Sequence, residues 1–201
     1  MEAMWTRFLP SIQEVQSILR SGALGKINKL DAELAYPIPF DPNSRLYNVE
    51  MGGGALFDLG IYTVSLAHML FGKPQQVTSK VTMASTDVDE ESEYVLEYQD
   101  GVTCALSSSL KHRGRNQAIV SGDLGSIILR DPFISCRELL QSDIQISLDS
   151  KVSYKVRKLA ALTNKFPFFA VSGVLIWRKP QTKEVAPNRY ARFTIEPNIY
   201  S

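Results

Sequence analysis

The stretch SEYVLEYQDGVTCALSSSL, residues 92–110, decides the fold. Its first half alternates between two sets of side chains, namely Tyr94, Leu96 and Tyr98 on one face and the more polar Glu93, Val95 and Glu97 on the other. This period of two residues is typical of a β-strand. Asp100 and Gly101 then predict a tight turn, because both tolerate the positive φ angles of a type I′ hairpin. Residues 102–110 return antiparallel to the first strand. The alternation does not indicate which face of the first strand points outward.

Working outward from this hairpin, we expect more strands on both sides of it. Residues 76–85 precede it, residues 117–121 and 126–130 flank a turn after it, and residues 26–36 alternate apolar with charged side chains. Residues 11–20 have the spacing of a helix, and residues 52–72 predict a mostly buried helix that is apolar nearly all round. Two helices and a run of hairpin-linked strands predict an α+β fold, with one mostly antiparallel sheet and both helices on a single face.

Charge divides the chain unevenly. The 201 residues are 44% hydrophobic and 21% charged, with a net charge of +1, which gives no reason to expect a nucleic-acid partner. Residues 1–150 carry 12 Lys and Arg against 19 Asp and Glu, whereas residues 151–201 carry 10 against 2. The regular pattern fades after about residue 132. We therefore divide the chain into a domain at 1–133 and a poorly recognisable basic tail at 134–201, which an aberrant reading of a longer gene would explain.

Other classes of site are not expected. Cys104, Cys136, His68 and His112 do not have the close spacing of metal ligands, which predicts no metal site. The longest apolar stretch, residues 166–177, is too short to span a bilayer, and no signal peptide precedes the first helix. We expect a cytoplasmic protein without a membrane partner.

Two segments carry the chemistry, MEAMWTRFLP at residues 1–10 and GGGALFDLGIY at residues 52–62. Consecutive glycines at a helix start allow close approach of a backbone or ligand, and free N–H groups there favour an anion. Asp58 and Tyr62 are four residues apart, so an α-helix presents them on one face, where they suit proton transfer to a hydroxyl or carbonyl group. The tyrosine pKa near 10 then needs a neighbouring cation to lower it. A local hydrogen bond for Asp58, and simple packing for Tyr62, Trp5 and Arg7, stay open as alternatives.

Taken in order, EAMWTRFLP, SGALG, GGGALFDLGIY and GDLGSIILRDPF resemble the Gfo/Idh/MocA oxidoreductases over residues 1–133. The likeness is to the branch of dihydrodiol dehydrogenase and glucose–fructose oxidoreductase. It implies an N-terminal Rossmann domain that binds NAD or NADP, then an α+β domain with a substrate pocket and a homodimer interface on its open sheet face. It also implies that Tyr62 is the proton donor or acceptor, accompanied by Asp58, and that Trp5 and Arg7 line the junction of cofactor and substrate.

The chain departs from this family in what it lacks. The Rossmann glycines and the Glu-Lys-Pro motif, whose lysine assists the catalytic group, are missing from the 201 residues, and the family's C-terminal helix is not recognisable. We therefore expect the substrate-binding and dimerisation part of an NAD(P)-dependent oxidoreductase for the CH–OH group of a sugar or diol. This part should be inactive, and should bind no NAD(P), without the nucleotide-binding domain. The alternatives are a non-catalytic remnant that binds sugar or dimerises, and a decayed gene fragment.

Overall fold

The computed structural model describes residues 4–130, 132–136, 139–146, 152–159, 168–171 and 174–177. The chain divides into two compact units, Met1–Leu162 and Thr163–Ser201. Within the second unit the structure describes an antiparallel pair of strands, β9 (Phe168–Val171) and β10 (Val174–Trp177). The rest of the basic segment from residue 160 onward lies outside the described residues.

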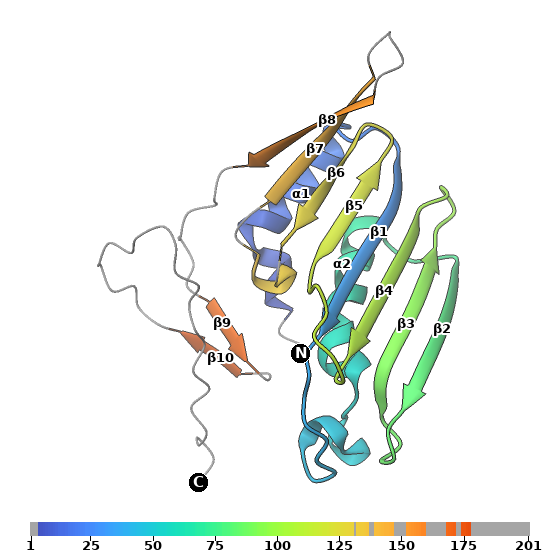
Figure 1. Cartoon of the computed structure of the whole chain (residues 1–201), viewed down its shortest axis with the longest axis vertical. Coiled ribbons are helices and arrows are strands. Elements are labelled where there is room, and N and C mark those ends of the chain that lie inside the picture. Colours follow the sequence, from blue (N-terminus) through green and yellow to red (C-terminus); the bar gives the residue numbers. More distant parts are fainter. Residues whose placement is uncertain are drawn as a thin grey trace. The chain divides into compact units, whose positions relative to one another are not determined.

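The first unit is built on one eight-stranded sheet, ordered β2-β3-β4-β1-β5-β6-β7-β8 (Figure 1). Its strands are β1 (Ile27–Ala35), β2 (Gln76–Met83), β3 (Asp89–Glu97), β4 (Thr103–Ser109), β5 (Ala118–Gly122), β6 (Gly125–Leu129), β7 (Leu139–Ile146) and β8 (Val152–Leu159). Neighbours in this sheet pair antiparallel, except that β1 runs parallel to β4. The expected mostly antiparallel sheet is confirmed.

Two helices, α1 (Pro10–Arg20) and α2 (Ile61–Phe71), lie on the same side of this sheet (Figure 1). Pro10 occupies the first helical position of α1, where a missing N–H costs no hydrogen bond. α1 buries Ile12, Val15 and Ile18 against the sheet. Helices on a single face of the sheet are thus confirmed. Short turns complete the unit: η1 (Trp5–Phe8), η2 (Arg45–Tyr47), η3 (Val49–Met51), η4 (Leu56–Gly60) and η5 (Phe133–Ser135).

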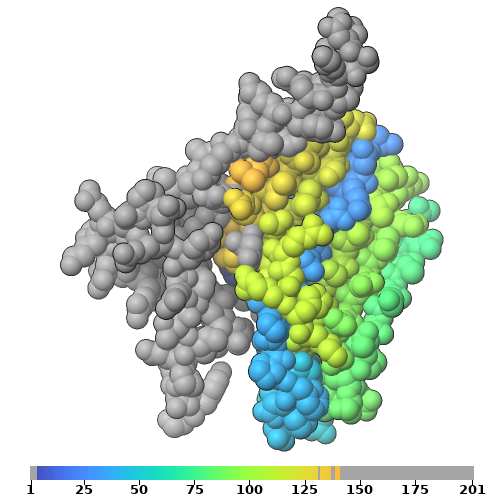
Figure 2. Space-filling model, viewed as in Figure 1, coloured from blue at the N-terminus to red at the C-terminus, as the bar shows by residue number. Residues whose placement is uncertain are grey.

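The sheet has one buried and one open face. Tyr94, Leu96 and Tyr98 lie beneath the helices and are 5–7% exposed, while the alternating residues Glu93, Val95 and Glu97 are exposed on the other side. The question that alternation left open is settled by where the helices pack. No helix covers the face turned toward the viewer in Figure 2, among the described residues.

The segment Val49–Phe71 is long and apolar enough to cross a membrane by length and composition alone. Core helices meet the same criterion, so this is weak support for a membrane span. In the fold the segment is divided among η3, η4 and α2, and α2 packs on β1 and β4 with Leu66 and Ala67 in the core. The remaining apolar side chains of α2 are mostly half-buried, not enclosed.

The ordered sheet continues beyond residue 133. Strands β7 and β8 extend it, and the compact unit runs to Leu162. Thr6 Oγ1 donates to the carbonyl of Ile134 at 3.2 Å, and Ser11 Oγ donates to that of Cys136 at 2.8 Å. Residues just past the expected boundary thus hold the N-terminal segment in place. The separate roles expected for 1–133 and 134–201 stay predictions.

Candidate functional site

The glycine-rich start of the helical segment packs against a carboxylate of the protein itself. Gly54 has φ 119°, and a side chain there would collide with Asp89 Oδ1. Asp89 Oδ2 accepts hydrogen bonds from the backbone N–H of Leu56 at 2.7 Å and from Ser92 Oγ at 2.6 Å. The anion that lies at this helix start is therefore a side chain of the protein itself, Asp89 of strand β3. The helix start is therefore built for internal packing.

The element that follows is a π turn. In η4 the backbone N–H of Ile61 bonds to the carbonyl of Leu56, five residues earlier. Such turns are rare and occur often at functional sites. Asp58 lies within this π turn and Tyr62 in the first turn of α2, so the two residues are on successive turns of one continuous helical segment.

Asp58, on this π turn, forms an ion pair with Arg45 of η2. The two side chains are 23% and 40% exposed. A pair this exposed contributes only about 0.2–1 kcal/mol to stability. Its consequence is geometric, since Arg45 Nη2 donates to one carboxylate oxygen of Asp58 and ties the π turn to η2.

Tyr62 lies in the first turn of α2, half-buried and packed against the main core. Its ring thus has a packing role whatever its hydroxyl does. The Asp58 carboxylate accepts a hydrogen bond from Arg45, which fits the alternative reading of Asp58 as a residue with a local structural contact. Catalytic roles for Tyr62 and Asp58 stay predictions.

Gly60, which lies between Asp58 and Tyr62 in the sequence, is a glycine because a larger residue would not fit there. A side chain on Gly60 would collide with the hydroxyl of Tyr94 and lie 2.9 Å from Ser108 Oγ. Tyr94 Oη and Ser108 Oγ are hydrogen-bonded to each other at 2.8 Å under the π turn. Burial raises the pKa of Tyr94, so this phenol stays protonated. Gly60 lets the Asp58 turn lie directly on strands β3 and β4.

The N-terminal segment meets the helical segment in space, because η1 packs against α2. Trp5 is half-buried, and its indole N–H is buried without an acceptor among the described residues. Arg7 and Phe8 are exposed on the same turn. The structure therefore packs the first of the two segments against the helix that continues the second. The roles assigned to Trp5 and Arg7 stay predictions.

Two residues of the site, Arg45 and Asp89, were missed by sequence reasoning. Arg45 follows a proline-rich stretch that has no periodicity, and Asp89, the first residue of β3, belongs to no sequence motif. Their partners lie 13 and 33 residues away. Only the folded chain shows these pairings. Within the described residues no cluster of three or more His, Cys, Asp or Glu side chains could hold a metal ion.

Solved structures share this fold. Levoglucosan dehydrogenase, in complex with NADH and levoglucosan, matches with a TM-score of 0.65 and 21% identity over 79% of this chain and 46% of that one. A 3-ketoreductase from Actinomadura kijaniata, in complex with NADP, matches with a TM-score of 0.67 and 22% identity over 80% of this chain and 49% of that one.

Sequence relatives point the same way. Trans-1,2-dihydrobenzene-1,2-diol dehydrogenase of Xenopus laevis is 37% identical over 129 residues, which are 63% of this chain and 38% of the relative. The enzyme of the same name from Bos taurus is 35% identical over 146 residues, which are 70% of this chain and 42% of the relative. The chain thus spans about two fifths of the length of these relatives. Residues 12–128, more than half of the chain, match the family described as GFO/IDH/MocA C-terminal domain, and the chain belongs to that family.

Proposed function

We propose that this chain is the substrate-binding part of an NAD(P)-dependent oxidoreductase that interconverts a CH–OH group and a carbonyl in a sugar or cyclic diol. The observation that carries the proposal is the π turn Leu56–Gly60, which holds Asp58 against Arg45 directly before the first turn of the Tyr62 helix. The names of the matching dehydrogenases support the substrate class.

In this proposal Tyr62 exchanges a proton with the substrate oxygen, and Asp58 orients the substrate or the tyrosine. Arg45 acts as a positioning residue, because it touches Asp58. General acid–base catalysis requires the proton-carrying group within hydrogen-bond reach of the reacting oxygen. The proposal is supported by a carboxylate held by an arginine and a tyrosine on the next turn of the same helical segment.

The residues of η1 fit a contact with the nicotinamide end of a dinucleotide. The indole N–H of Trp5 is a buried donor without an acceptor among the described residues, and such a donor suits an amide oxygen. Arg7 is exposed beside it. When bound, the nicotinamide would accept or give the hydride. The role of Trp5 and Arg7 is to position that ring against the substrate carbon.

The phosphates of the dinucleotide must be held by another domain. The glycine-rich helix start is filled by Asp89, and the G-x-G-x-x-G pattern is absent from the 201 residues. Positioning of two reactants is worth about 7–11 kcal/mol of the barrier. We therefore propose that the chain alone neither binds NAD(P) nor turns over substrate.

The open sheet face is proposed as a homodimer interface. Register places Val95, Ala105, Asp31, Ile119 and Ile128 in one row across five neighbouring strands. A shallow groove of about 530 Å³ lies on this face, and Asp31, Val95, Ala105 and Ile119 are among the residues that line it. A row of four apolar side chains, with the single charged residue Asp31 among them, suits packing against a second copy.

The proposal is tested by supplying the missing half. The nucleotide-binding domain of the Xenopus laevis relative is joined upstream of residue 1, and NAD(P)H formation is measured with cyclic trans-diols and monosaccharides. We expect turnover from the joined protein and none from the chain alone. The relative's own C-terminal domain, rejoined at the same junction, controls for damage by the junction. A joined protein that binds NADH and diol without turnover would favour the non-catalytic alternative, and turnover by the chain alone would contradict the proposal.

A further inference from the structure

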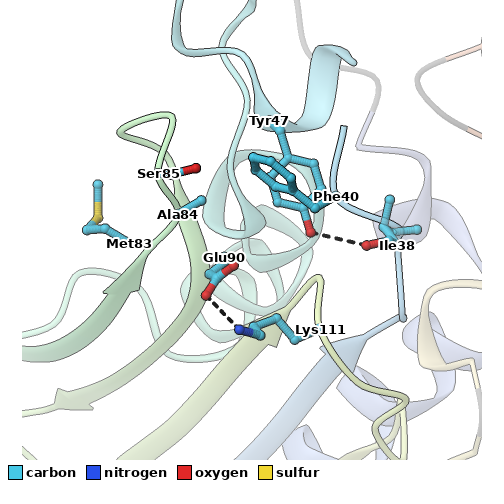
Figure 3. Close-up of a pocket in the computed structure, with 8 residues that line it drawn as sticks. All are labelled: Ile38, Phe40, Tyr47, Met83, Ala84, Ser85, Glu90 and Lys111. Atoms are coloured by element: carbon cyan, nitrogen blue, oxygen red, sulfur yellow. Dashed lines mark hydrogen bonds and ion pairs between the residues drawn. The ribbon is translucent and has the colours of Figure 1, made fainter. Parts of the chain in front are cut away.

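A separate pocket of about 390 Å³ opens between the loop before η2 and the β2–β3 turn (Figure 3). Eight residues line it: Ile38, Phe40, Tyr47, Met83, Ala84, Ser85, Glu90 and Lys111. Its volume is within the range of small-molecule sites. A buried cluster of Tyr47, Ala55, Ala84, Val88 and Leu110, with Leu59 packed against it, lies beside the pocket. None of the predicted catalytic residues lines it.

One wall of the pocket is aromatic. The rings of Phe40 and Tyr47 pack edge to face, with centroids 4.9 Å apart and planes at 71°. Phe40 is 52% exposed, so its ring is available to a ligand, whereas Tyr47 is only 2% exposed. The Tyr47 hydroxyl donates to the carbonyl of Ile38 at 3.2 Å, which fixes the ring. An aromatic wall in which Phe40 packs on the fixed Tyr47 ring suits the C–H face of a chair-shaped ring.

The other wall is polar and electrically balanced. Lys111 Nζ lies 2.9 Å from Glu90 Oε1, across the pocket from the two rings (Figure 3). Glu90 is 16% exposed and Lys111 50% exposed. An ammonium has three donors and a carboxylate two acceptor oxygens, so one mutual bond leaves capacity on both. The Ser85 hydroxyl adds a group that both donates and accepts.

This lining selects among ligand classes. An anion is repelled by the Glu90 carboxylate, and a cation is repelled by the Lys111 ammonium. A wholly apolar molecule removes water from both charged groups without replacing the hydrogen bonds that the water made. A neutral ring with adjacent hydroxyls satisfies both walls, because each hydroxyl can donate to Glu90 or accept from Lys111.

We propose that this pocket is a second binding site, distinct from the Asp58–Tyr62 helix, for a neutral hydroxylated ring such as a monosaccharide or a cyclic vicinal diol. The proposal does not depend on the proposed catalytic function, because the residues that line the pocket take no part in that chemistry. Tyr47 and Arg45 share η2, so a ligand seated on Tyr47 rests two residues from the partner of Asp58.

The test is a titration of the 201-residue chain followed by amide chemical shifts. The probes are trans-cyclohexane-1,2-diol and D-glucose, with cyclohexanol and benzoate as controls for a single hydroxyl and for charge. We expect saturable shifts at the Ser85 and Lys111 amides with a Kd of about 1–50 mM for the vicinal diol or sugar. Cyclohexanol and benzoate should bind at least about tenfold more weakly, since each leaves the ion pair partly unsatisfied.

Substitutions of residues that line the pocket test whether the diol binds there. Lys111→Met and Phe40→Ala should each weaken diol binding about tenfold, while Lys111→Arg should retain most of it. Lys73→Met removes an exposed lysine elsewhere and is the matched control. Phe40 and Lys111 are half-exposed, so both variants should fold, which a melting curve verifies. Absence of saturable shifts, shifts confined to the Asp58–Tyr62 helix, or diol affinity unchanged in Lys111→Met and Phe40→Ala would overturn the proposal.

Discussion

Asp89 Oδ2, at the start of strand β3, accepts a hydrogen bond at 2.7 Å from the backbone N–H of Leu56, the first residue of the π turn. This bond ties the sheet to the element that carries Asp58. A carboxylate at the N-terminal end of a helical segment also meets the positive end of the peptide dipoles. Asp89 therefore serves as the cap that the glycine-rich stretch itself cannot provide.

Replacing Asp89 with Asn should lower the free energy of unfolding by about 1–2 kcal/mol, because a neutral amide is a weaker acceptor for the N–H of Leu56 and the Ser92 hydroxyl. Urea denaturation measures this. Asp87→Asn is the matched control, since Asp87 is exposed and its φ of 59° is one that asparagine tolerates. Equal losses in the two variants would refute the capping role.

Tyr62→Phe should reduce kcat by about 10²–10⁴-fold in the protein joined to a nucleotide-binding domain, the usual range for loss of a general acid or base. The melting temperature should change little, because phenylalanine fills nearly the same volume in the half-buried site. Steady-state kinetics and a melting curve check both points. A variant that keeps more than about half of the wild-type kcat would show that Tyr62 only packs.

Gly60→Ala should destabilise the first unit by about 1–3 kcal/mol, because the added methyl group meets the Tyr94 hydroxyl. Removing that hydroxyl makes room. Tyr94→Phe in the same chain should therefore recover part of the loss, and a double-mutant cycle by urea denaturation measures the coupling. Strictly additive losses would mean that the crowding between these two residues is relieved elsewhere.

Alkaline pH should weaken the fold through Cys104 and Tyr98. Burial raises the pKa of Cys104 from its ordinary 9.0 to about 12 and that of Tyr98 from 10.0 to about 12. The folded state then holds protons that the unfolded state loses, so the stabilisation is complete below pH 9 and is lost as pH rises toward 12. Urea denaturation between about pH 8 and pH 11 should show a falling free energy of unfolding. Cys104→Ala should flatten this slope, and a wild-type curve without slope would contradict both pKa values.

Val95→Lys should shift the chain from dimer to monomer in sedimentation equilibrium, because it replaces one of the apolar side chains of the open-face row with a charged one. Val77→Lys is the control. Val77 pairs with Leu96, so it belongs to the helix-side face of edge strand β2, where it is 59% exposed. A wild-type chain that stays monomeric at high concentration would count against a homodimer through this face.

Periodicity was enough to predict the sheet and α1, because strands such as β3 and β4 bury every second side chain and α1 buries a single stripe. It did not assign the two faces of β3, since both contain apolar residues and only the position of the helices distinguishes them. The π turn left no mark either: the close approach of Gly60 to Tyr94 joins it to a distant strand, and no local sequence pattern specifies that approach. The Arg45–Asp58 pair joins two irregular segments, which no local pattern specifies.

The parallel pairing of β1 with β4 has a consequence for how the chain is made. Both neighbours of β1, which are β4 and β5, lie later in the sequence, after α2, β2 and β3. During synthesis β1 therefore leaves the ribosome before either of the strands it pairs with, and its ladder with β4 can be completed only after residue 109 has emerged. Non-local pairings of this kind slow folding and leave intermediates prone to aggregation. β1 thus stays unpaired during synthesis for longer than the strands of a local hairpin such as β3 and β4.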